Sequence, residues 1–302
     1  MTALLLAGLI GLLLAAGGLV LWAAWLEPRS LTVTRLEIAS PAWPGSAGAL
    51  RIALLSDLHA SGPHDLPARY AQVVARANAE APDVVLLLGD YVGRHRAKTA
   101  SVAPEAIAPV LGRLRAPLGV YAVLGNHDWR FGGRRVARAL AAAGIEVLDN
   151  AARRLRRAGG DCWLLGVGDA TVGADRLAAT LAQVTDDAPA LLMTHSPDIF
   201  PEVPARVALS VAGHTHGGQV RLPFAGALYV PSRHGLRYAY GHLVEDGRHG
   251  FVTRGLGHSV LPIRFLCPPE IVVITLRSAG EAQADAASTA AMKASSLAGS
   301  RA

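Results

Sequence analysis

The chain begins with a long apolar run. No residue from Thr2 to Leu26 is charged, and Leu, Ala and Gly predominate. A helix of this length would measure about 37 Å, more than the roughly 30 Å of a bilayer's hydrocarbon core. Trp22 and Trp25 lie near its end, as in the aromatic belt of a membrane interface. We predict a single-pass membrane anchor over residues 1–28, with a cleaved signal peptide and a buried core helix as the alternatives. The mixed charges that follow leave its orientation open.

After the anchor, short continuous apolar runs alternate with stretches of helical periodicity. Continuous apolar runs are typical of strands that are covered on both faces. The sequence therefore predicts an α/β fold, a two-sheet sandwich with outer helices, in addition to the N-terminal transmembrane helix. The predicted strands are 31–38, 50–56, 84–89, 119–124, 163–167, 190–194, 207–212, 250–254 and 271–276. The predicted helices are 67–80, 104–114, 134–143 and 174–183.

The C-terminal segment, residues 278–302, is almost entirely Ala, Ser, Gly and scattered charge, with too little apolar bulk to fold alone. We predict a disordered tail there and one folded domain over residues 29–277. In the whole chain, 51% hydrophobic and 17% charged residues exclude a disordered protein. The two cysteines, Cys162 and Cys267, are too far apart for a cysteine-based zinc motif. The net charge of +6 suits anionic partners, such as phosphorylated ligands or acidic lipid headgroups.

Polar residues with metal-binding side chains gather at the carboxyl ends of the predicted strands, where open α/β sheets place their sites. The first strand end gives Asp57 and His59, which leave the strand on the same side because they are two residues apart. The later ends give Gly89-Asp90, Gly125-Asn126-His127-Asp128, Thr194-His195 and Gly213-His214-Thr215-His216. Carboxylate, amide and imidazole groups together suit divalent transition metals such as Mn, Fe or Zn. The set is too rich for one ion, and one carboxylate can bridge two.

Taken singly, each block has a simpler interpretation. Gly89-Asp90 is also an ordinary turn, and Asn126 also suits a helix cap. The pair His214 and His216 also suits a structural zinc site. The order of the blocks and their placement at strand ends favour a two-ion site. Two divalent ions beside two carboxylates and a hydroxide leave about one positive charge, which suits a phosphate ester.

These five ordered blocks resemble those of the calcineurin-like metallophosphoesterase superfamily, over residues 50–276. The sequences Arg254-Gly255-Leu256-Gly257 and Pro268-Pro269-Glu270 resemble a membrane-associated bacterial branch of it. That branch includes phosphodiesterases and a UDP-diacylglucosamine pyrophosphatase of lipid A synthesis. The resemblance implies that residues 29–277 form a metallophosphoesterase domain with a two-sheet core.

The resemblance also implies roles for the residues of the blocks. Two divalent ions, Mn, Fe or Zn, would be bound and would activate the attacking water. The implied ligands are Asp57, His59 and His216 for the first ion, Asn126, His195 and His214 for the second, and Asp90 as the bridge. The implied catalytic residues are His127, which would donate a proton to the leaving group, and Asp128, which would orient His127.

Basic residues near the blocks are candidates for binding an anionic substrate. Arg94 and Arg96 follow Asp90, and Arg130 follows His127. The alternative is a solvated basic face, which is the usual role of such charges.

The function that we expect is that of a membrane-anchored, metal-dependent hydrolase of a phosphodiester or pyrophosphate at the bacterial inner membrane. Its substrate would be a phosphorylated, lipid-linked small molecule, such as UDP-2,3-diacylglucosamine. One alternative is a cell-envelope phosphatase or phosphodiesterase acting on a wall polymer or phospholipid. Another is a membrane scaffold with a structural metal site. Basic residues scattered away from aromatic ones disfavour nucleic acid as a partner, and no protein partner is implied.

Overall fold

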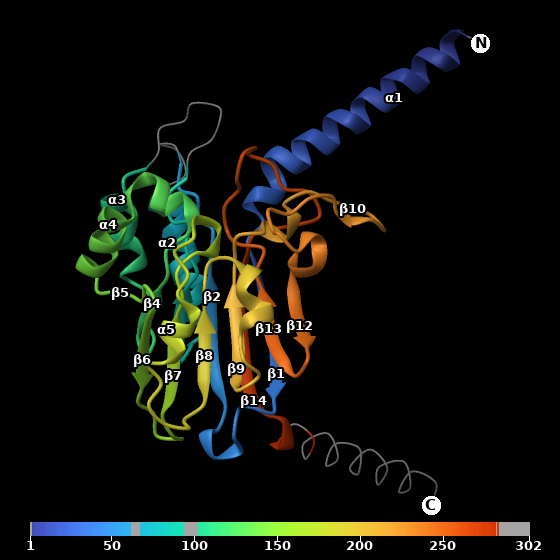
Figure 1. The fold of residues 1–302 in the computed structure, drawn as a ribbon. Coiled ribbons are helices and arrows are strands. Elements are labelled where there is room, and N and C mark those ends of the chain that lie inside the picture. Colours follow the sequence, from blue (N-terminus) through green and yellow to red (C-terminus); the bar gives the residue numbers. More distant parts are fainter. Residues whose placement is uncertain (1, 62–66, 94–101, 282, 284–302) are drawn as a thin grey trace, which may run out of the picture.

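The computed structural model describes residues 2–61, 67–93, 102–281 and 283, in which two six-stranded sheets pack face to face (Figure 1). The first sheet has the order β1 (Thr32–Ser40), β14 (Glu270–Ser278), β2 (Leu50–Leu55), β3 (Val84–Leu87), β4 (Val120–Ala122) and β5 (Glu146–Val147). The second has the order β12 (Gly241–Glu245), β13 (Arg248–Val252), β9 (Val207–Ala212), β8 (Ala190–Met193), β7 (Cys162–Gly166) and β6 (Ala151–Leu155). A separate hairpin joins β10 (Arg221–Leu222) and β11 (Gly226–Ala227). The predicted two-sheet α/β fold is confirmed.

Buried apolar residues hold the two sheets together. Ile52 and Leu54 of β2 belong to the same core cluster as Leu191 and Met193 of β8, so this core lies between the sheets. The outer face of the first sheet packs against helices, which explains why β3 is buried over its whole length. These helices are α2 (Pro67–Ala79), α3 (Pro104–Leu111) and α4 (Asn126–Ala142). The outer face of the second sheet packs against α5 (Leu177–Leu181).

Strands β2, β3 and β4 are parallel to one another, as are β7, β8 and β9. The carboxyl ends of parallel strands lie at one edge of a sheet, so the polar blocks that follow them are brought together.

Some elements differ from the predicted ones. Helix α4 begins at Asn126, eight residues before the predicted start, where the Asp128 carboxyl group accepts a hydrogen bond from Gly125 N at 3.0 Å. The helix is interrupted at Gly132, where φ is 131°, so the predicted helix corresponds to its second part. The prediction omitted β5, β6, β10, β11 and β12, which are short or polar. Strand β6 has the sequence Ala-Ala-Arg-Arg-Leu, and its two arginines form ion pairs with Glu146, Asp161 and Asp186. A charged edge strand of this kind has no apolar alternation by which to find it.

The N-terminal apolar segment forms a helix that projects away from the two sheets (Figure 1). Helix α1 (Thr2–Leu21) continues into a π-helical turn, η1 (Trp22–Leu26), and a 3-10 turn, η2 (Glu27–Arg29). The stretch Leu4–Arg29 contains an 18-residue window with a mean hydropathy of 2.6 and is long and apolar enough to cross a membrane. No residue of its most apolar 18-residue window is buried, unlike in a core helix. Of the predicted tail, residue 282 and residues 284–302 lie outside the described residues.

A buried carboxylate fixes the end of the N-terminal helix to the domain. Glu27 is only 2% exposed and accepts hydrogen bonds from Trp22 Nε1 at 2.6 Å and from Leu266 N at 3.0 Å. A third donor is the backbone N–H of Cys267. Three donors satisfy the ionised carboxyl group, which would otherwise be costly to bury.

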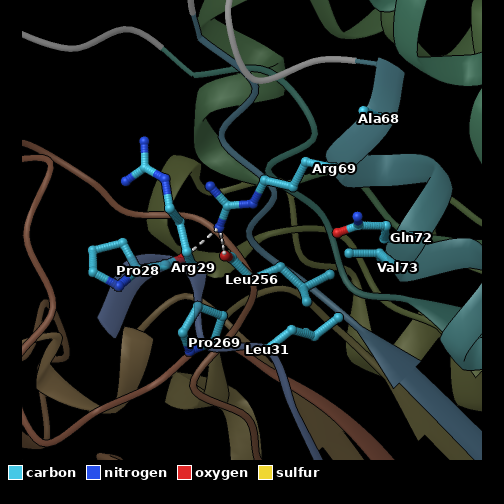
Figure 2. Close-up of a pocket in the computed structure, with 9 residues that line it drawn as sticks. All are labelled: Pro28, Arg29, Leu31, Ala68, Arg69, Gln72, Val73, Leu256 and Pro269. Carbon is cyan, nitrogen blue, oxygen red and sulfur yellow. Dashed lines mark hydrogen bonds between the residues drawn. The ribbon is translucent and has the colours of Figure 1, made fainter. Parts of the chain in front are cut away.

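Beside this contact lies a cleft of about 310 Å³ between η2 and α2 (Figure 2). Figure 2 shows the Arg69 side chain reaching across from α2, where it donates to the carbonyl oxygens of Pro28 at 3.0 Å and Leu256 at 2.8 Å. The base of the N-terminal helix is thereby hydrogen-bonded to the loop that follows β13.

Candidate metal centre

Seven buried side chains from both sheets meet where the strands end. Asp57 and His59 follow β2, Asp90 follows β3, and Asn126 begins α4 after β4. The second sheet contributes the remaining three, which are His195 after β8 and His214 and His216 after β9. The structure therefore brings together all seven residues predicted as metal ligands.

One group consists of Asp57, His59 and His216. Asp57 Oδ1 lies 3.5 Å from His216 Nε2 and 3.8 Å from His59 Nε2. The two Nε2 atoms are 3.0 Å apart. One ligand atom from each residue lies within 4.8 Å of the others, which is close enough for a shared metal ion.

A second group consists of Asp90, His195 and His214. His195 Nε2 lies 3.4 Å from Asp90 Oδ2 and 3.1 Å from His214 Nδ1. Asp90 Oδ2 is also 3.4 Å from His59 Nε2 in the first group. The other oxygen, Oδ1, accepts a hydrogen bond from His127 N at 2.8 Å. Asp90 thus stands between the two groups and presents one oxygen to both.

Backbone carbonyl groups fix the tautomers of two histidines. His195 Nδ1 is 2.8 Å from Leu88 O, and His214 Nε2 is 2.8 Å from Pro231 O. Since a carbonyl oxygen only accepts, both of these ring nitrogens carry the proton and donate it. The opposite nitrogens, His195 Nε2 and His214 Nδ1, turn toward the centre. This outer hydrogen bonding is typical of metal-binding histidines.

Burial and charge set the protonation states. Burial lowers the pKa of His59, His214 and His216, which favours neutral imidazole, the form that binds metal. Burial opposes ionisation of Asp90, but His195 and His59 hold the pKa of this carboxyl group well below its usual range. Asp90 in turn raises the pKa of His195 against the effect of burial. The centre therefore combines ionised carboxylate with mostly neutral imidazole.

Five of the seven residues have a left-handed backbone. The φ angles are 54° at Asp57, 45° at His59, 55° at Asp90, 70° at His214 and 52° at His216. Non-glycine residues rarely adopt such angles, and their strain is characteristic of functional sites. The sequence shows no sign of this conformation, because none of the five is a glycine.

His127 lies half-buried beside the first group. Its ring packs edge-on against that of His59, with the ring centroids 4.6 Å apart. The backbone N–H is used by Asp90, but the ring itself faces the cleft described below. His127 is thus placed to meet a group bound at the centre.

Asp128 differs from its expected position as the partner of His127. Its Oδ2 accepts from Asp90 N at 2.8 Å and Gly125 N at 3.0 Å. Its Oδ1 accepts from Tyr91 N at 3.0 Å and Val92 N at 3.2 Å. Burial and the nearby Asp90 raise the pKa of Asp128 to about 8, while the four N–H donors favour the ionised form. The carboxyl group fixes the two strand-end loops rather than the imidazole, because backbone donors occupy both oxygens.

Comparison with known proteins decides the family. Residues 50–218 match the family model described as calcineurin-like phosphoesterase. The chain belongs to this family. Metallophosphoesterase YkuE of Bacillus subtilis is 33% identical over 88% of the chain and 92% of its own length. Phosphodiesterase YaeI of Escherichia coli is 31% identical over 83% and 90%. UDP-2,3-diacylglucosamine pyrophosphatase LpxG of Chlamydia trachomatis is 27% identical over 84% and 91%.

A calcineurin-like phosphoesterase uses divalent metal ions, and the residues of this centre fit such ions. Among the residues that the structure describes, no group donates a hydrogen bond to the buried oxygen Asn126 Oδ1. A buried oxygen in this state is costly unless something satisfies it, and a cation would do so. The mixture of carboxylate, amide oxygen and imidazole is also a suitable donor set for Mn, Fe or Zn.

A cleft of about 760 Å³ opens over the centre of this phosphoesterase. His127 and Arg130 line it, whereas Arg94 and Arg96, the other two predicted substrate-binding residues, lie outside the described residues. Sequence reasoning missed Arg233, which also lines the cleft. Its backbone N–H donates to the Asp198 carboxyl group at 3.3 Å, and its guanidinium group donates to Asp198 O at 2.8 Å and to Glu202 at 3.2 Å. These tertiary contacts hold Arg233 at the cleft, and the sequence around it carries no signal of them.

Proposed function

We propose that this calcineurin-like phosphoesterase is a membrane-anchored hydrolase that cleaves a phosphodiester or pyrophosphate with two divalent ions. The observation that carries the proposal is the position of Asp90 Oδ2, at 3.4 Å from both His59 Nε2 and His195 Nε2. A carboxylate oxygen held between two groups of imidazoles is suited to bridge two cations. A single structural zinc site would need only one such group.

Each of the two groups would hold one ion. The proposed ligands are Asp57, His59 and His216 for the first, Asn126, His195 and His214 for the second, and Asp90 for both. When bound, such ions lower the pKa of a coordinated water and offset the charge of a phosphoryl group. Which of Mn, Fe and Zn is used depends on supply as well as on these ligands.

The protein's own residues would do the remaining chemistry. The His127 imidazole, facing the cleft, would donate a proton to the leaving oxygen and stabilise negative charge on phosphorus. Asp128 would hold the backbone that carries both Asp90 and His127. Arg130 at the cleft wall would attract the anionic substrate.

We further propose that the substrate is linked to a lipid, as in UDP-2,3-diacylglucosamine. Two features support this: a relative named as a pyrophosphatase of that compound, and the apolar N-terminal helix. In this view residues 1–28 anchor the chain in the bacterial inner membrane, and residues 29–277 form the catalytic domain at its surface.

Hydrolysis by the full chain in detergent with added Mn tests the proposal. The substrates are para-nitrophenyl phosphate, bis(para-nitrophenyl) phosphate and UDP-2,3-diacylglucosamine. We expect metal-dependent turnover that Asp90→Asn abolishes and that His127→Ala slows. The matched control is Asp246→Asn, which alters an exposed carboxylate on the β12–β13 turn. Turnover that survives both substitutions, or that needs no metal, would contradict the proposal. The substrate that is hydrolysed fastest identifies the class of bond.

A further inference from the structure

Large hydrophobic side chains are exposed on one part of the folded domain. Beyond the anchor, the described chain exposes ten such side chains, and seven of them belong to two short segments. We call these seven the apolar rim: Leu222, Phe224, Leu228, Tyr229, Val260, Leu261 and Leu266. Single exposed apolar residues are ordinary, but a gathered set marks a surface of interaction.

The apolar rim is hydrogen-bonded to the base of the anchor. Arg264 N donates to Ala23 O of η1 at 2.8 Å, and Leu266 N donates to Glu27 at 3.0 Å. The segment that carries Arg264 and Leu266 is also bonded to the hairpin, because Arg221 N of β10 donates to Phe265 O at 2.9 Å. The anchor, the loop and the hairpin therefore form one connected unit, and Figure 1 shows β10 on the same side of the domain as α1.

Three residues of the apolar rim have a left-handed backbone. The φ angles are 66° at Phe224, 64° at Val260 and 52° at Leu266. Glycine would adopt these turns without strain, whereas bulky or β-branched residues do so at a cost. Phe224 is also fully exposed, at the tip of the hairpin. A strained backbone that carries a fully exposed phenylalanine indicates that the exposed side chain has a role.

The apolar rim is continuous with the wall of the catalytic cleft. Tyr229, Val260 and Leu261 are rim residues that also line the cleft above Asp90 and His127. The cleft thus has one polar wall, which carries the candidate metal centre, and one apolar wall, which leads outward to the rim.

We propose that the apolar rim lies in the surface of the bilayer that α1 spans, so that the catalytic cleft opens toward lipid. The proposal rests on the membrane anchor of the proposed function. It deepens that function by assigning the class of substrate: an amphiphile whose apolar chains stay at the rim while its phosphoryl group reaches the centre. Phe224 and Tyr229 are aromatic residues of the kind that membrane interfaces favour. Because the rim is bonded to the anchor, the tether holds it within reach of the bilayer.

A nitroxide label at position 224 tests where the rim lies. The full chain with Phe224→Cys is labelled and reconstituted in a bilayer of phosphatidylethanolamine and phosphatidylglycerol. Cys162 and Cys267 are buried and should not react. The matched control is the label at Asp246→Cys, on the exposed β12–β13 turn. The measurement compares how often the label collides with dissolved oxygen, which concentrates in lipid, and with a water-soluble nickel complex. We expect the label at 224 to collide more with oxygen and the label at 246 to collide more with the nickel complex.

Equal behaviour of the two labels would overturn the proposal. Spin–spin broadening at 224 that disappears on dilution with unlabelled protein would also overturn it, because a second copy of the chain would then cover the rim.

Activity provides a second, independent readout. Phe224→Gly removes the side chain and relieves the backbone, so the variant should fold. We expect a several-fold loss of hydrolysis of UDP-2,3-diacylglucosamine embedded in the same bilayer, and unchanged hydrolysis of soluble bis(para-nitrophenyl) phosphate. Val244→Ala, which shortens an exposed apolar residue of β12, is the matched control and should change neither.

An equal loss on both substrates would overturn the role of the rim, since the side chain would then act on the centre directly. If the parent chain hydrolyses neither substrate, the proposed function fails, while the label at 224 still decides the position of the rim.

Discussion

His59 Nε2 and His216 Nε2 face each other at 3.0 Å, although one histidine follows β2 of the first sheet and the other follows β9 of the second. Two neutral imidazoles can share only one proton, and the Asp57 carboxylate lies beside both. The two sheets thus converge on a point where three electron-pair donors meet, and a cation would be bound by all three.

Divalent metal should therefore stabilise the folded protein. At a concentration about one hundred times its dissociation constant, Mn should add about 2.7 kcal/mol to the free energy of unfolding. His59→Ala and His216→Ala should each remove most of this gain, whereas Asp246→Asn should keep it. Thermal unfolding with and without Mn measures the effect. An equal gain in stability in the parent and in all three variants would show that Mn binds elsewhere.

His127→Ala should slow the reaction without releasing metal. A lost proton donor typically costs about 10² to 10⁴ in rate when the leaving group is poor. The loss should be smaller with para-nitrophenolate, which leaves without a proton. Comparing an alkyl phosphodiester with bis(para-nitrophenyl) phosphate gives the difference, and metal analysis of the purified variant gives the ion content. Because the His127 ring contacts that of His59, loss of bound metal in the variant would instead identify His127 as a ligand.

Much of the candidate centre could be predicted because parallel strands end at a common edge. That rule placed Asp57 near Asp90 at the edge of one sheet and His195 near His214 at the edge of the other, and the structure brings the two edges together. The rule could not predict the partners of Asp128. The sequence around this residue would be the same whether its carboxyl group bound the His127 side chain or backbone N–H groups. The four N–H donors are brought to it by the packing of two loops.

Other features have no signal along the chain. Strand β6 is held by ion pairs at the sheet edge, and an Arg-Arg pair does not predict a strand. The apolar rim combines residues from two segments about forty positions apart, so hydropathy along the chain does not reveal it. The positive φ of His214 is imposed by tertiary contacts, which local propensity does not contain.

Gly125→Ala should disturb the centre by steric overlap alone. A β-carbon at this position would collide with the Asp90 carboxyl group and would lie 2.7 Å from His195 Cε1. Gly125 itself has an extended backbone that alanine adopts freely, so conformational strain is not involved. Overpacking of this kind costs about 1–3 kcal/mol. Displaced ligands should also weaken metal binding by about 10- to 100-fold, as do changes around other metal sites.

Titration calorimetry with Mn measures the weaker binding in Gly125→Ala. The matched control is Gly45→Ala, whose added β-carbon would meet its nearest neighbour at an ordinary 3.7 Å. An unchanged metal affinity in Gly125→Ala would mean that Asp90 and His195 can move aside without loss, contrary to a rigid centre.

Glu80 should make the stability of the fold depend on pH. Its carboxyl group accepts hydrogen bonds from Arg35 of β1 at 2.8 Å and from Arg51 of β2 at 2.9 Å, and it is only 10% exposed. The hydrogen bond from Arg35 and the charges of both arginines lower the pKa of Glu80 from 4.5. Because the folded pKa lies below the unfolded one, the stabilisation is complete above the unfolded value and is lost as the pH falls through the folded value.

Glu80→Gln should therefore be less stable than the parent by about 0.5–1 kcal/mol at neutral pH, since one partner, Arg35, is largely exposed. The difference should shrink on acidification and be nearly gone below the folded pKa, where the parent carboxyl group is itself protonated. Urea unfolding of both proteins across the acid range measures it. Glu105→Gln, which removes a more exposed ion pair with Arg135, is the control and should change stability less. A difference that stays constant with pH would show that Glu80 acts through the shape of its hydrogen bonds and not through its charge.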